Sequence, residues 1–335
     1  MKIYILICTR PNCIKVTRFK EVAKTLPSMK IKIIHTGQHY DEKMVDVFFR
    51  QFQLEPDYFL NIPPVSANKQ MAEIMLRLED LMHEIGKPDL LLVPGDVNST
   101  LAGALVANKM GIPLGHIEAG LRSFDNTMPE EHNRVLTDKL ADYFFVTEQS
   151  GLDILKKEGV EEHRIIFSGN TMIDTLVKFE KEIENSSILS SLKIEQQAFV
   201  LMTMHRPATV DDLQGLQKLL ELINEVTKTY KIIFPIHPRT LKRLDEFGLK
   251  ESFTSHSHLI LTDPLDYFSF QKLIKYCQFI LTDSGGIQEE STFVGKPCLT
   301  LRPNTERPIT ITEGTNTLVP FELNSIKHYI SQIES

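Results

Sequence analysis

Acidic side chains follow two neighbouring apolar runs in the first half of the chain, where they could act as acids and bases. Asp96 ends the run DLLLVPGD and Glu118 ends the run PLGHIE, while Glu130 and Glu131 open the helix-like segment PEEHNR. Carboxylates at adjacent strand ends can converge on one site, and partial burial there tunes their pKa values for proton transfer. Asp96 could instead cap the following helix, and Glu130 or Glu131 could simply favour a helix N-terminus. Glu118 is the hardest of the four to explain structurally, so a site for proton transfer is favoured.

A pair of glycines in the second half has the pattern of an anion site. Asp283, Ser284, Gly285 and Gly286 stand between the apolar run QFILT and the helix-like segment IQEES. Two glycines let the backbone approach a ligand closely, and the free N–H groups of a helix N-terminus suit a diphosphate. Glu290, one turn further on, could accept hydrogen bonds from ribose hydroxyls. A simple tight turn is the alternative, but the strand–helix context favours the anion site.

Basic residues near predicted strand ends could hold a phosphate group. Arg10 follows the first apolar run, and Lys15 lies one turn into the next helix. Arg302 and Arg307 lie in a loop that contains two prolines. A solvated helix start explains the first pair equally well, and surface salt bridges explain the second pair equally well.

Histidines stand at or just after three predicted strand ends. His205 ends FVLMTMH, and together with Arg206 it could contact a phosphate or shuttle a proton. His237 ends KIIFPIH, and His39 follows TGQ. A single histidine is usually structural, but three at strand ends indicate a polar site. His35, which lies inside an apolar run, is expected in the core.

Short apolar runs alternate with amphipathic segments in both halves, as expected for buried parallel strands in βαβ units. Each half therefore predicts a doubly wound, Rossmann-like α/β domain, in which ligands bind beyond the carboxyl ends of the strands. We expect domains at residues 1–180 and 198–335, a linker region at 181–197 and a ligand cleft between the domains. The runs cover residues 3–7, 31–36, 89–96, 113–118 and 142–148, and then 199–205, 231–237, 258–263, 278–283 and 296–301.

The composition excludes several classes of protein. The 335 residues contain 42% apolar and 24% charged side chains and carry a net charge of −7, values typical of a globular chain. A non-specific nucleic-acid binder would usually be basic, and no apolar segment approaches the ~20 residues of a membrane span. The four cysteines form no CxxC pair, and no basic leader with a long apolar stretch opens the sequence. We therefore expect a cytoplasmic protein with free thiols.

Sequence motifs for metal and cofactor chemistry are absent. There is no HExxH, the histidines lack short ligand spacing, and the first strand leads into CTRPN rather than GxGxxG. A GxSxG elbow and a Walker A loop are absent as well. The sequence therefore predicts neither a metal nor a nicotinamide cofactor.

Nine segments carry a resemblance to a known family. They run in order from residue 9 to residue 316: TRPNCIK, TGQHYD, PGDVNSTLAGALVANKMGIPLGHIEAGLRS, MPEEHNRVLTD, SGNTMID, MHRP, IHPR, TDSGGIQEES and TERPITITEGTN. Each is weak alone, but HIEAGLRS with MPEEHNR and SGGIQEES is a highly specific combination. Together they resemble the UDP-N-acetylglucosamine 2-epimerase family, non-hydrolysing type.

The resemblance implies two Rossmann-like domains in a GT-B-like arrangement, the second of which binds UDP. It implies an enzyme that interconverts UDP-GlcNAc and UDP-ManNAc without metal or nicotinamide. In the implied reaction the C2 proton is removed and UDP leaves in an anti elimination to 2-acetamidoglucal. UDP adds back after reprotonation on the other face of C2. The leaving anion must be bound strongly by helix N–H groups and cations. A homodimer and a role in surface polysaccharide synthesis are also implied.

Matched to the family's motifs position by position, three carboxylates and one histidine would be catalytic: Asp96, Glu118, Glu130 and His205. Which carboxylate acts on which face of C2 stays open. Phe270 in PLDYFSF would lie near the uracil. The residues expected to contact UDP are Arg10, Ser284, Gly285, Gly286 and Glu290. Further candidates for substrate binding are Lys15, Gln38, Arg122, His237 and Arg302.

The chain departs from the family's pattern at several positions. Cys8 and Asn12 in CTRPNCIK replace the usual Gly and Glu, and HRPAT has Thr209 where Asn is usual. TGQHYDEKM differs from the TGQHREM form associated with activation by UDP-GlcNAc, so we expect weak or absent activation. The chain stops at Ser335, before a final helix that is usual in the family. Loss of that helix could loosen domain closure or impair activity.

Four other functions stay open beside this epimerase. A close variant would act on a modified UDP-HexNAc, such as a 6-deoxy or uronate sugar. A GT-B glycosyltransferase would need an acceptor, and three carboxylates favour proton transfer at carbon over donor binding alone. A hydrolysing epimerase has a GTRA-type motif, which CTRPN does not match. A non-catalytic nucleotide-sugar sensor would not need the four catalytic matches.

Overall fold

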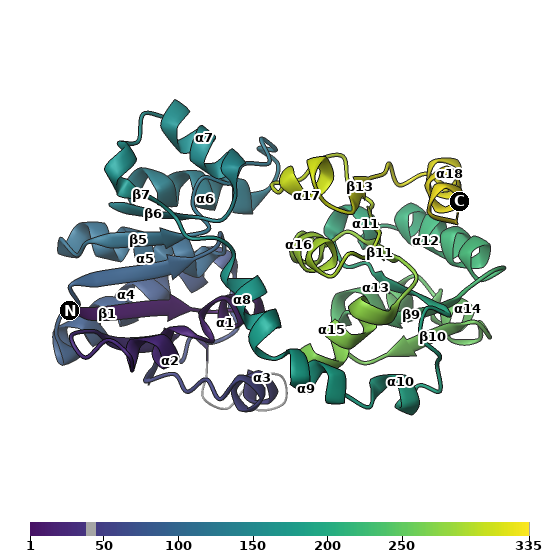
Figure 1. The fold of residues 1–335 in the computed structure, drawn as a ribbon, viewed down its shortest axis with the longest axis horizontal. Coiled ribbons are helices and arrows are strands. Elements are labelled where there is room, and N and C mark those ends of the chain that lie inside the picture. Colours follow the sequence, from purple (N-terminus) through teal and green to yellow (C-terminus); the bar gives the residue numbers. More distant parts are fainter. Residues whose placement is uncertain (38–44, 335) are drawn as a thin grey trace. The chain divides into compact units, whose positions relative to one another are not determined.

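The computed structural model describes residues 1–37 and 45–334. The chain divides into two compact units, Met1–Thr175 and Leu176–Ser335. The division falls within helix α8 (Thr171–Lys178), and the range 181–197 expected as a linker carries most of α9 (Glu180–Asn185) and all of α10 (Ile188–Ser191). Each unit contains one sheet surrounded by helices (Figure 1).

The first unit is built on seven parallel strands in the order β3-β2-β1-β4-β5-β6-β7. In the register of β1, Ile3 lies opposite Ile31 on one side and Leu90 on the other. Tyr4 and Ile5 of this strand point to opposite faces and are both buried, as expected where helices cover both faces of a parallel sheet. The strands are β1 (Lys2–Ile7), β2 (Lys30–His35), β3 (Tyr58–Phe59), β4 (Leu90–Pro94), β5 (Leu114–Ile117), β6 (Tyr143–Val146) and β7 (Ile165–Phe167).

Local signals set the ends of the helices in this unit. Pro11 and Pro129 lie in the first turns of α1 and α6, where a missing N–H costs nothing. Helix α5 ends at Gly111, whose left-handed φ of 63° suits glycine. Besides α8, the helices are α1 (Arg10–Val16), α2 (Phe19–Ala23), α3 (Val45–Phe52), α4 (Ala67–Ile85), α5 (Asn98–Met110), α6 (Pro129–Leu140), α7 (Gln149–Lys157) and the 3-10 turn Glu162–Arg164.

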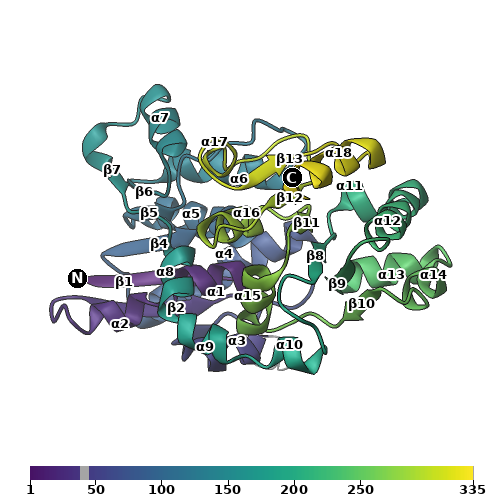
Figure 2. The same cartoon turned by 45° about the vertical axis from the view of Figure 1, so that its right-hand side comes forward.

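The second unit repeats this plan with six parallel strands in the order β10-β9-β8-β11-β12-β13. Figure 2 shows β11, β8, β9 and β10 in succession. The strands are β8 (Phe199–Thr203), β9 (Lys231–Pro235), β10 (Leu259–Thr262), β11 (Ile280–Thr282), β12 (Cys298–Thr300) and β13 (Asn316–Leu318). Its remaining helices are α11 (Pro207–Val210), α12 (Leu213–Val226), α13 (Pro238–Glu246), α14 (Lys250–Thr254), α15 (Tyr267–Tyr276), α16 (Gly286–Phe293), α17 (Ile309–Thr312) and α18 (Leu323–Glu334).

The strand order fixes where each unit can bind a ligand. Strand β1 lies between β2 and β4, and β8 lies between β9 and β11, so the chain changes direction across the sheet at these two points. Ligands of doubly wound sheets bind beyond the carboxyl ends of the strands there. The predicted fold class, two Rossmann-like doubly wound sheets, is thus confirmed. Across residues 1–37 and 45–334, no helix has the length and apolar character that crossing a membrane requires.

Candidate functional site

In the first unit, helix α1 brings two polar side chains to the ends of β1 and β4. The Asn12 amide donates to the Pro94 carbonyl oxygen at 3.1 Å, and its oxygen accepts from the backbone N–H groups of Cys8 and Thr9 at 3.3 Å. Asn12, a departure from the family's pattern, therefore ties the loop after β1 to the end of β4. Lys15 lies one turn further along the same helix.

Lys15 pairs with Glu118 in a buried position. Its Nζ atom lies 2.6 Å from Glu118 Oε2. Glu118 follows β5 with a left-handed φ of 68°, which is uncommon for a residue with a Cβ atom. Gly95, with a φ of 70°, leaves room for the pair, because a Cβ atom there would lie 3.0 Å from Lys15 Nζ and 3.9 Å from Glu118 Oε2. The ends of α1, β4 and β5 thus meet around one buried carboxylate.

Asp96 is held by a second buried cation, Arg134 of α6. The Arg134 guanidinium donates to Asp96 Oδ2 at 2.5 Å and to Glu131 Oε2 at 2.8 Å. Glu131 is itself buried, and it also accepts from the backbone N–H groups of Ser123 and Phe124. Among the described residues, the exposed side chain of Glu130 makes no hydrogen bond or ion pair. Of the two adjacent glutamates, Glu131 is therefore held by several hydrogen-bond partners, whereas Glu130 is open to solvent.

Two further candidates of the first unit have different surroundings. Arg10 opens α1 and stacks its guanidinium 4.9 Å from the ring centre of Phe48, and burial lowers the Arg10 pKa. Arg122 is buried, with its guanidinium 2.7 Å from Asp138 and 3.1 Å from Glu158, an arrangement that favours a structural role. Gln38 lies outside the described residues, as does His39.

In the second unit, Asp283 organises the ends of β8 and β11. Its buried carboxylate accepts from the backbone N–H of His205 at 3.0 Å and of Arg206 at 2.8 Å, and it lies 3.3 Å from His205 Nδ1. Burial lowers the pKa of His205, although the charge of Asp283 opposes that shift. His237 stacks its ring 5.5 Å from that of His205 and caps α13 by accepting from the N–H of Arg239. The two predicted histidines are therefore neighbours.

The glycine turn before α16 is crowded by a buried ionic network. A Cβ atom on Gly285 would lie 2.5 Å from Glu306 Oε1 and 3.2 Å from Arg307, so a larger residue there would displace the Glu306 carboxylate. Glu306 pairs with Arg302 at 3.2 Å and with Arg307 at 2.5 Å. Burial lowers the pKa of Arg302; Glu306 opposes this shift, whereas the charge of nearby Arg206 adds to it. Arg307 also pairs with Glu289 at 2.5 Å, so the two arginines have carboxylate partners, and it is the free N–H groups of the helix N-terminus that suit an anion.

Glu290 lies on the buried side of α16. Burial raises its pKa to about 7, and the side chains of Gln271 and Tyr267 on α15 are near enough to influence it. Phe270, also on α15, is half-buried and packs against the neighbouring apolar core. Glu290 and Phe270, which are predicted to contact the ribose and the uracil, therefore lie on two helices of the second unit.

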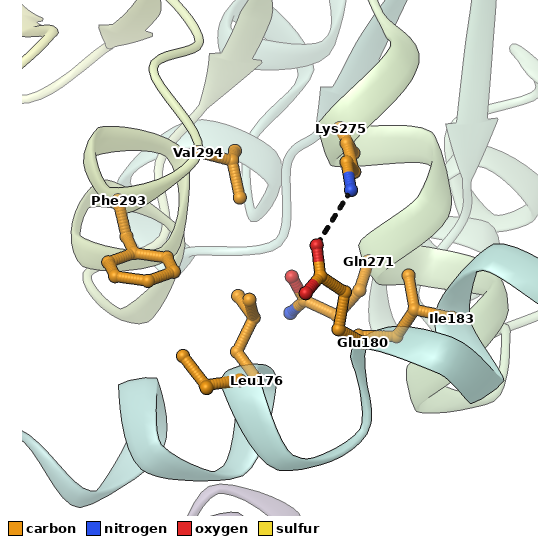
Figure 3. Close-up of a pocket in the computed structure, with 8 residues that line it drawn as sticks. Leu176, Glu180, Ile183, Gln271, Lys275, Phe293 and Val294 are labelled. Atoms are coloured by element: carbon orange, nitrogen blue, oxygen red, sulfur yellow. Dashed lines mark hydrogen bonds and ion pairs between the residues drawn. The ribbon is translucent and has the colours of Figure 1, made fainter.

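A separate cavity of about 250 Å³ opens at the far end of α16 from the glycine turn (Figure 3). The ion pair between Glu180 and Lys275, at 3.2 Å, lies at its edge. None of the residues predicted for the site lines it, so we assign no chemistry to this cavity. Its lining consists of Leu176, Val177, Glu180, Ile183, Gln271, Lys275, Phe293 and Val294.

Several site residues escaped the sequence reasoning. Asp283 stands in the TDSGG motif and Arg134 stands in MPEEHNR, so both were visible as motif members without an assigned role. His116 and Asp138 likewise stand in the segments HIEAGLRS and MPEEHNRVLTD, but His and Asp are common in structural positions and neither residue was assigned a role. Within the described part of the chain, no group of three or more His, Cys, Asp or Glu side chains could hold a metal ion.

The chain is thus a two-domain protein of Rossmann-like α/β units, one with two carboxylates bound by buried cations and one with a glycine turn beside a buried ionic network. The model of the UDP-N-acetylglucosamine 2-epimerase family matches residues 21–335. The chain is 40% identical to a UDP-N-acetylglucosamine 2-epimerase of Methanococcus maripaludis, over 99% of this chain and 91% of that protein. It is 38% identical to a UDP-2,3-diacetamido-2,3-dideoxy-D-glucuronate 2-epimerase of Pseudomonas aeruginosa, over 95% and 88% of the two chains.

A solved structure agrees with these likenesses. The crystal structure of the Methanocaldococcus jannaschii UDP-GlcNAc 2-epimerase, in complex with UDP-GlcNAc and UDP, matches with a TM-score of 0.92. The two sequences are 38% identical, and the match covers 99% of this chain and 92% of that chain. The chain belongs to the UDP-N-acetylglucosamine 2-epimerase family, and it is an epimerase, an enzyme of the isomerase class.

Proposed function

We propose that this epimerase interconverts UDP-GlcNAc and UDP-ManNAc. One observation carries the proposal: two carboxylates at the ends of adjacent strands, Asp96 and Glu118, are each bound by a buried cation. Such paired, partly desolvated carboxylates suit proton transfer at carbon. The likeness to UDP-GlcNAc 2-epimerases supports the choice of substrate.

The reaction that we propose is an anti elimination followed by re-addition. A base removes the C2 proton, the C–H electron pair forms the C1=C2 double bond, and the C1–O bond breaks so that UDP leaves with its electron pair. The neutral intermediate is 2-acetamidoglucal. A proton then adds to the opposite face of C2, and a β-phosphate oxygen of UDP attacks C1. No carbonyl group adjoins C2, so stabilising the UDP anion must supply much of the barrier reduction.

The roles divide between proton transfer and binding of UDP. We propose that Asp96, Glu118 and Glu130 exchange protons with C2. Burial lowers the pKa of His205, and a ring N–H of His205 can donate to an oxygen of the diphosphate. Residues proposed to bind UDP are Arg10, Ser284, Gly285, Gly286, Glu290, Arg302 and Phe270, the last beside the uracil. Arg122 is left out because two carboxylates, Asp138 and Glu158, hold its guanidinium. Glu131 is left out because both of its carboxylate oxygens accept backbone hydrogen bonds.

A modified sugar is the second candidate substrate. The relative from Pseudomonas aeruginosa is named for a diacetamido uronate, and its identity of 38% is close to the 40% of the UDP-N-acetylglucosamine 2-epimerase from Methanococcus maripaludis. Overall identity therefore does not separate the two sugars. We further propose, on the family resemblance, that the enzyme is a homodimer that supplies ManNAc units for surface polysaccharides.

The test is a product assay by proton NMR with three substrates. The chain is incubated with UDP-GlcNAc, with UDP-ManNAc and with the UDP-diacetamido uronate, and the anomeric signals are followed. The proposal expects the first two to reach the same mixture. If the UDP-diacetamido uronate is converted and UDP-GlcNAc is not, the modified sugar is the substrate. Conversion that requires an added acceptor, or release of free ManNAc, would overturn the proposal. Light scattering of the same sample measures the mass expected of a dimer.

A further inference from the structure

A buried histidine of the first unit bridges two backbone segments next to the candidate carboxylates. His116 lies in β5, two residues before Glu118. Its Nδ1 atom is 2.6 Å from Asp138 Oδ1, and its Nε2 atom is 2.8 Å from the carbonyl oxygen of Gly95, the residue before Asp96. Both side chains of the pair are fully enclosed. The imidazole therefore connects α6 to the turn that carries Asp96.

The second oxygen of Asp138 contacts the turn that carries Glu118. Asp138 Oδ2 accepts from the backbone N–H of Gly120 at 3.1 Å and lies 2.7 Å from the Arg122 guanidinium. This turn contains a left-handed Glu118, a conformation that persists only where the surroundings hold it. One carboxylate thus reaches the Asp96 turn through an imidazole and the Glu118 turn directly.

We propose that Asp138 and His116 are positioning residues for proton transfer, because they fix the two turns from which Asp96 and Glu118 project. The inference rests on the proposed function, in which these two carboxylates exchange protons with C2. Small displacements of reacting groups cost large factors in rate, so a device that fixes both turns together contributes to turnover. Neither residue reaches the reacting atoms in this role, since each acts through backbone atoms of the turns.

The hydrogen bonds of His116 specify its charge as well as its place. A carbonyl oxygen can only accept, and an ionised carboxylate can only accept. Burial by itself would raise the pKa of Asp138, but the charges and hydrogen bonds of His116 and Arg122 outweigh burial and lower it. A ring that donates to both acceptors must carry both protons. A buried ion pair of this kind is weak grounds for a gain in stability, which favours a role in fixing geometry.

The experiment compares Asp138→Asn with a matched control. Asparagine preserves the volume but turns an N–H₂ group toward a donor, either His116 or the Gly120 N–H. The control is Glu158→Gln, which removes the other carboxylate partner of Arg122 and leaves His116 and Gly120 untouched. We expect Asp138→Asn to lower kcat for UDP-GlcNAc about 10- to 100-fold. The KM for UDP-GlcNAc, the Kd for UDP and the control's kcat should stay within about twofold.

Three results would count against the inference. A kcat of Asp138→Asn equal to that of the wild type would overturn it, and so would an equal loss of kcat in Glu158→Gln. Should Asp138→Asn fail to fold, His116→Gln replaces it, because its amide can serve only part of the bridge. The third result is a nitrogen-15 NMR spectrum of histidine-labelled wild type in which one of the two His116 ring nitrogens carries no proton. The His116→Gln variant assigns the signal. A wild type without epimerase activity would instead refute the proposed function.

Discussion

The buried ion pair between Lys15 and Glu118 gives a prediction that can be worked out in numbers. The two side chains are only 7% and 5% exposed, and their charged atoms lie 2.6 Å apart. We consider Lys15→Met, Glu118→Gln and the double variant. Each single change leaves one charged or strongly polar partner buried without its counterpart, whereas the double variant removes both charges together.

The magnitude follows from burial. At an effective dielectric constant of about 20, unit charges at this separation attract by roughly 6 kcal/mol, and desolvation of both groups offsets much of that attraction. Removing one partner of a buried pair costs about 3–5 kcal/mol of unfolding free energy. For a unit of this size that corresponds to a fall in Tm of roughly 6–20 °C. The double variant should lose less than the sum of the singles, by about 1–3 kcal/mol.

The assay is thermal and urea unfolding followed by circular dichroism, because the chain contains no tryptophan. The control is the ion pair between Lys156 and Glu162 of the same unit, which has nearly the same separation, 2.7 Å, but is 44% and 81% exposed. The same set of single and double variants at Lys156 and Glu162 should give no resolvable coupling energy. Singles at Lys15 and Glu118 whose effects add to within about 0.5 kcal/mol would show that the pair is not coupled, and would refute this account of the buried carboxylate.

Three further results are expected. Gly285→Ala should weaken UDP binding about tenfold or more and lower Tm, because the new Cβ atom would lie 2.5 Å from Glu306. Titration calorimetry measures the Kd for UDP, and an unchanged Kd would contradict the close packing of the turn. His205→Ala and Asp96→Asn should each lower turnover by about two orders of magnitude, and near-normal rates in both would remove them from the site. Burial raises the Glu290 pKa to about 7, whereas the unfolded value is about 4.3. The folded chain therefore keeps a proton that the unfolded chain releases, so this group's contribution to stability falls as pH rises from about 4 to 7. Glu290→Gln should flatten that part of the Tm profile, and an unchanged profile would argue against the raised pKa.

Much of the fold could be predicted from the sequence, because buried parallel strands are nearly continuous apolar runs. All ten runs named in the sequence analysis correspond to strands of the two sheets. The three strands that it missed, β3, β7 and β13, lie at sheet edges and contain only two or three residues. A strand that short, with a neighbour on one side only, leaves little periodic signal.

The types of side chain at the site could be predicted from the sequence, but which of them contact one another could not. Polar motifs after β4, β5, β8 and β11 indicated where side chains would gather, because a parallel sheet brings its strand ends to one edge. Lys15 and Glu118, however, are 103 positions apart, and their contact depends on where the fold places α1 relative to the end of β5. Residue type likewise could not separate Glu130 from Glu131, because the difference arises from the helical rotation that buries one of them.

The most direct test of the central claim is the fate of the C2 hydrogen. Purified chain is incubated with UDP-GlcNAc in D₂O, and the products are followed by proton NMR. Elimination of UDP and reprotonation predict UDP-ManNAc with deuterium at C2. A UDP-ManNAc product that retains the original hydrogen at C2 would contradict proton exchange by the carboxylates at the ends of β4 and β5.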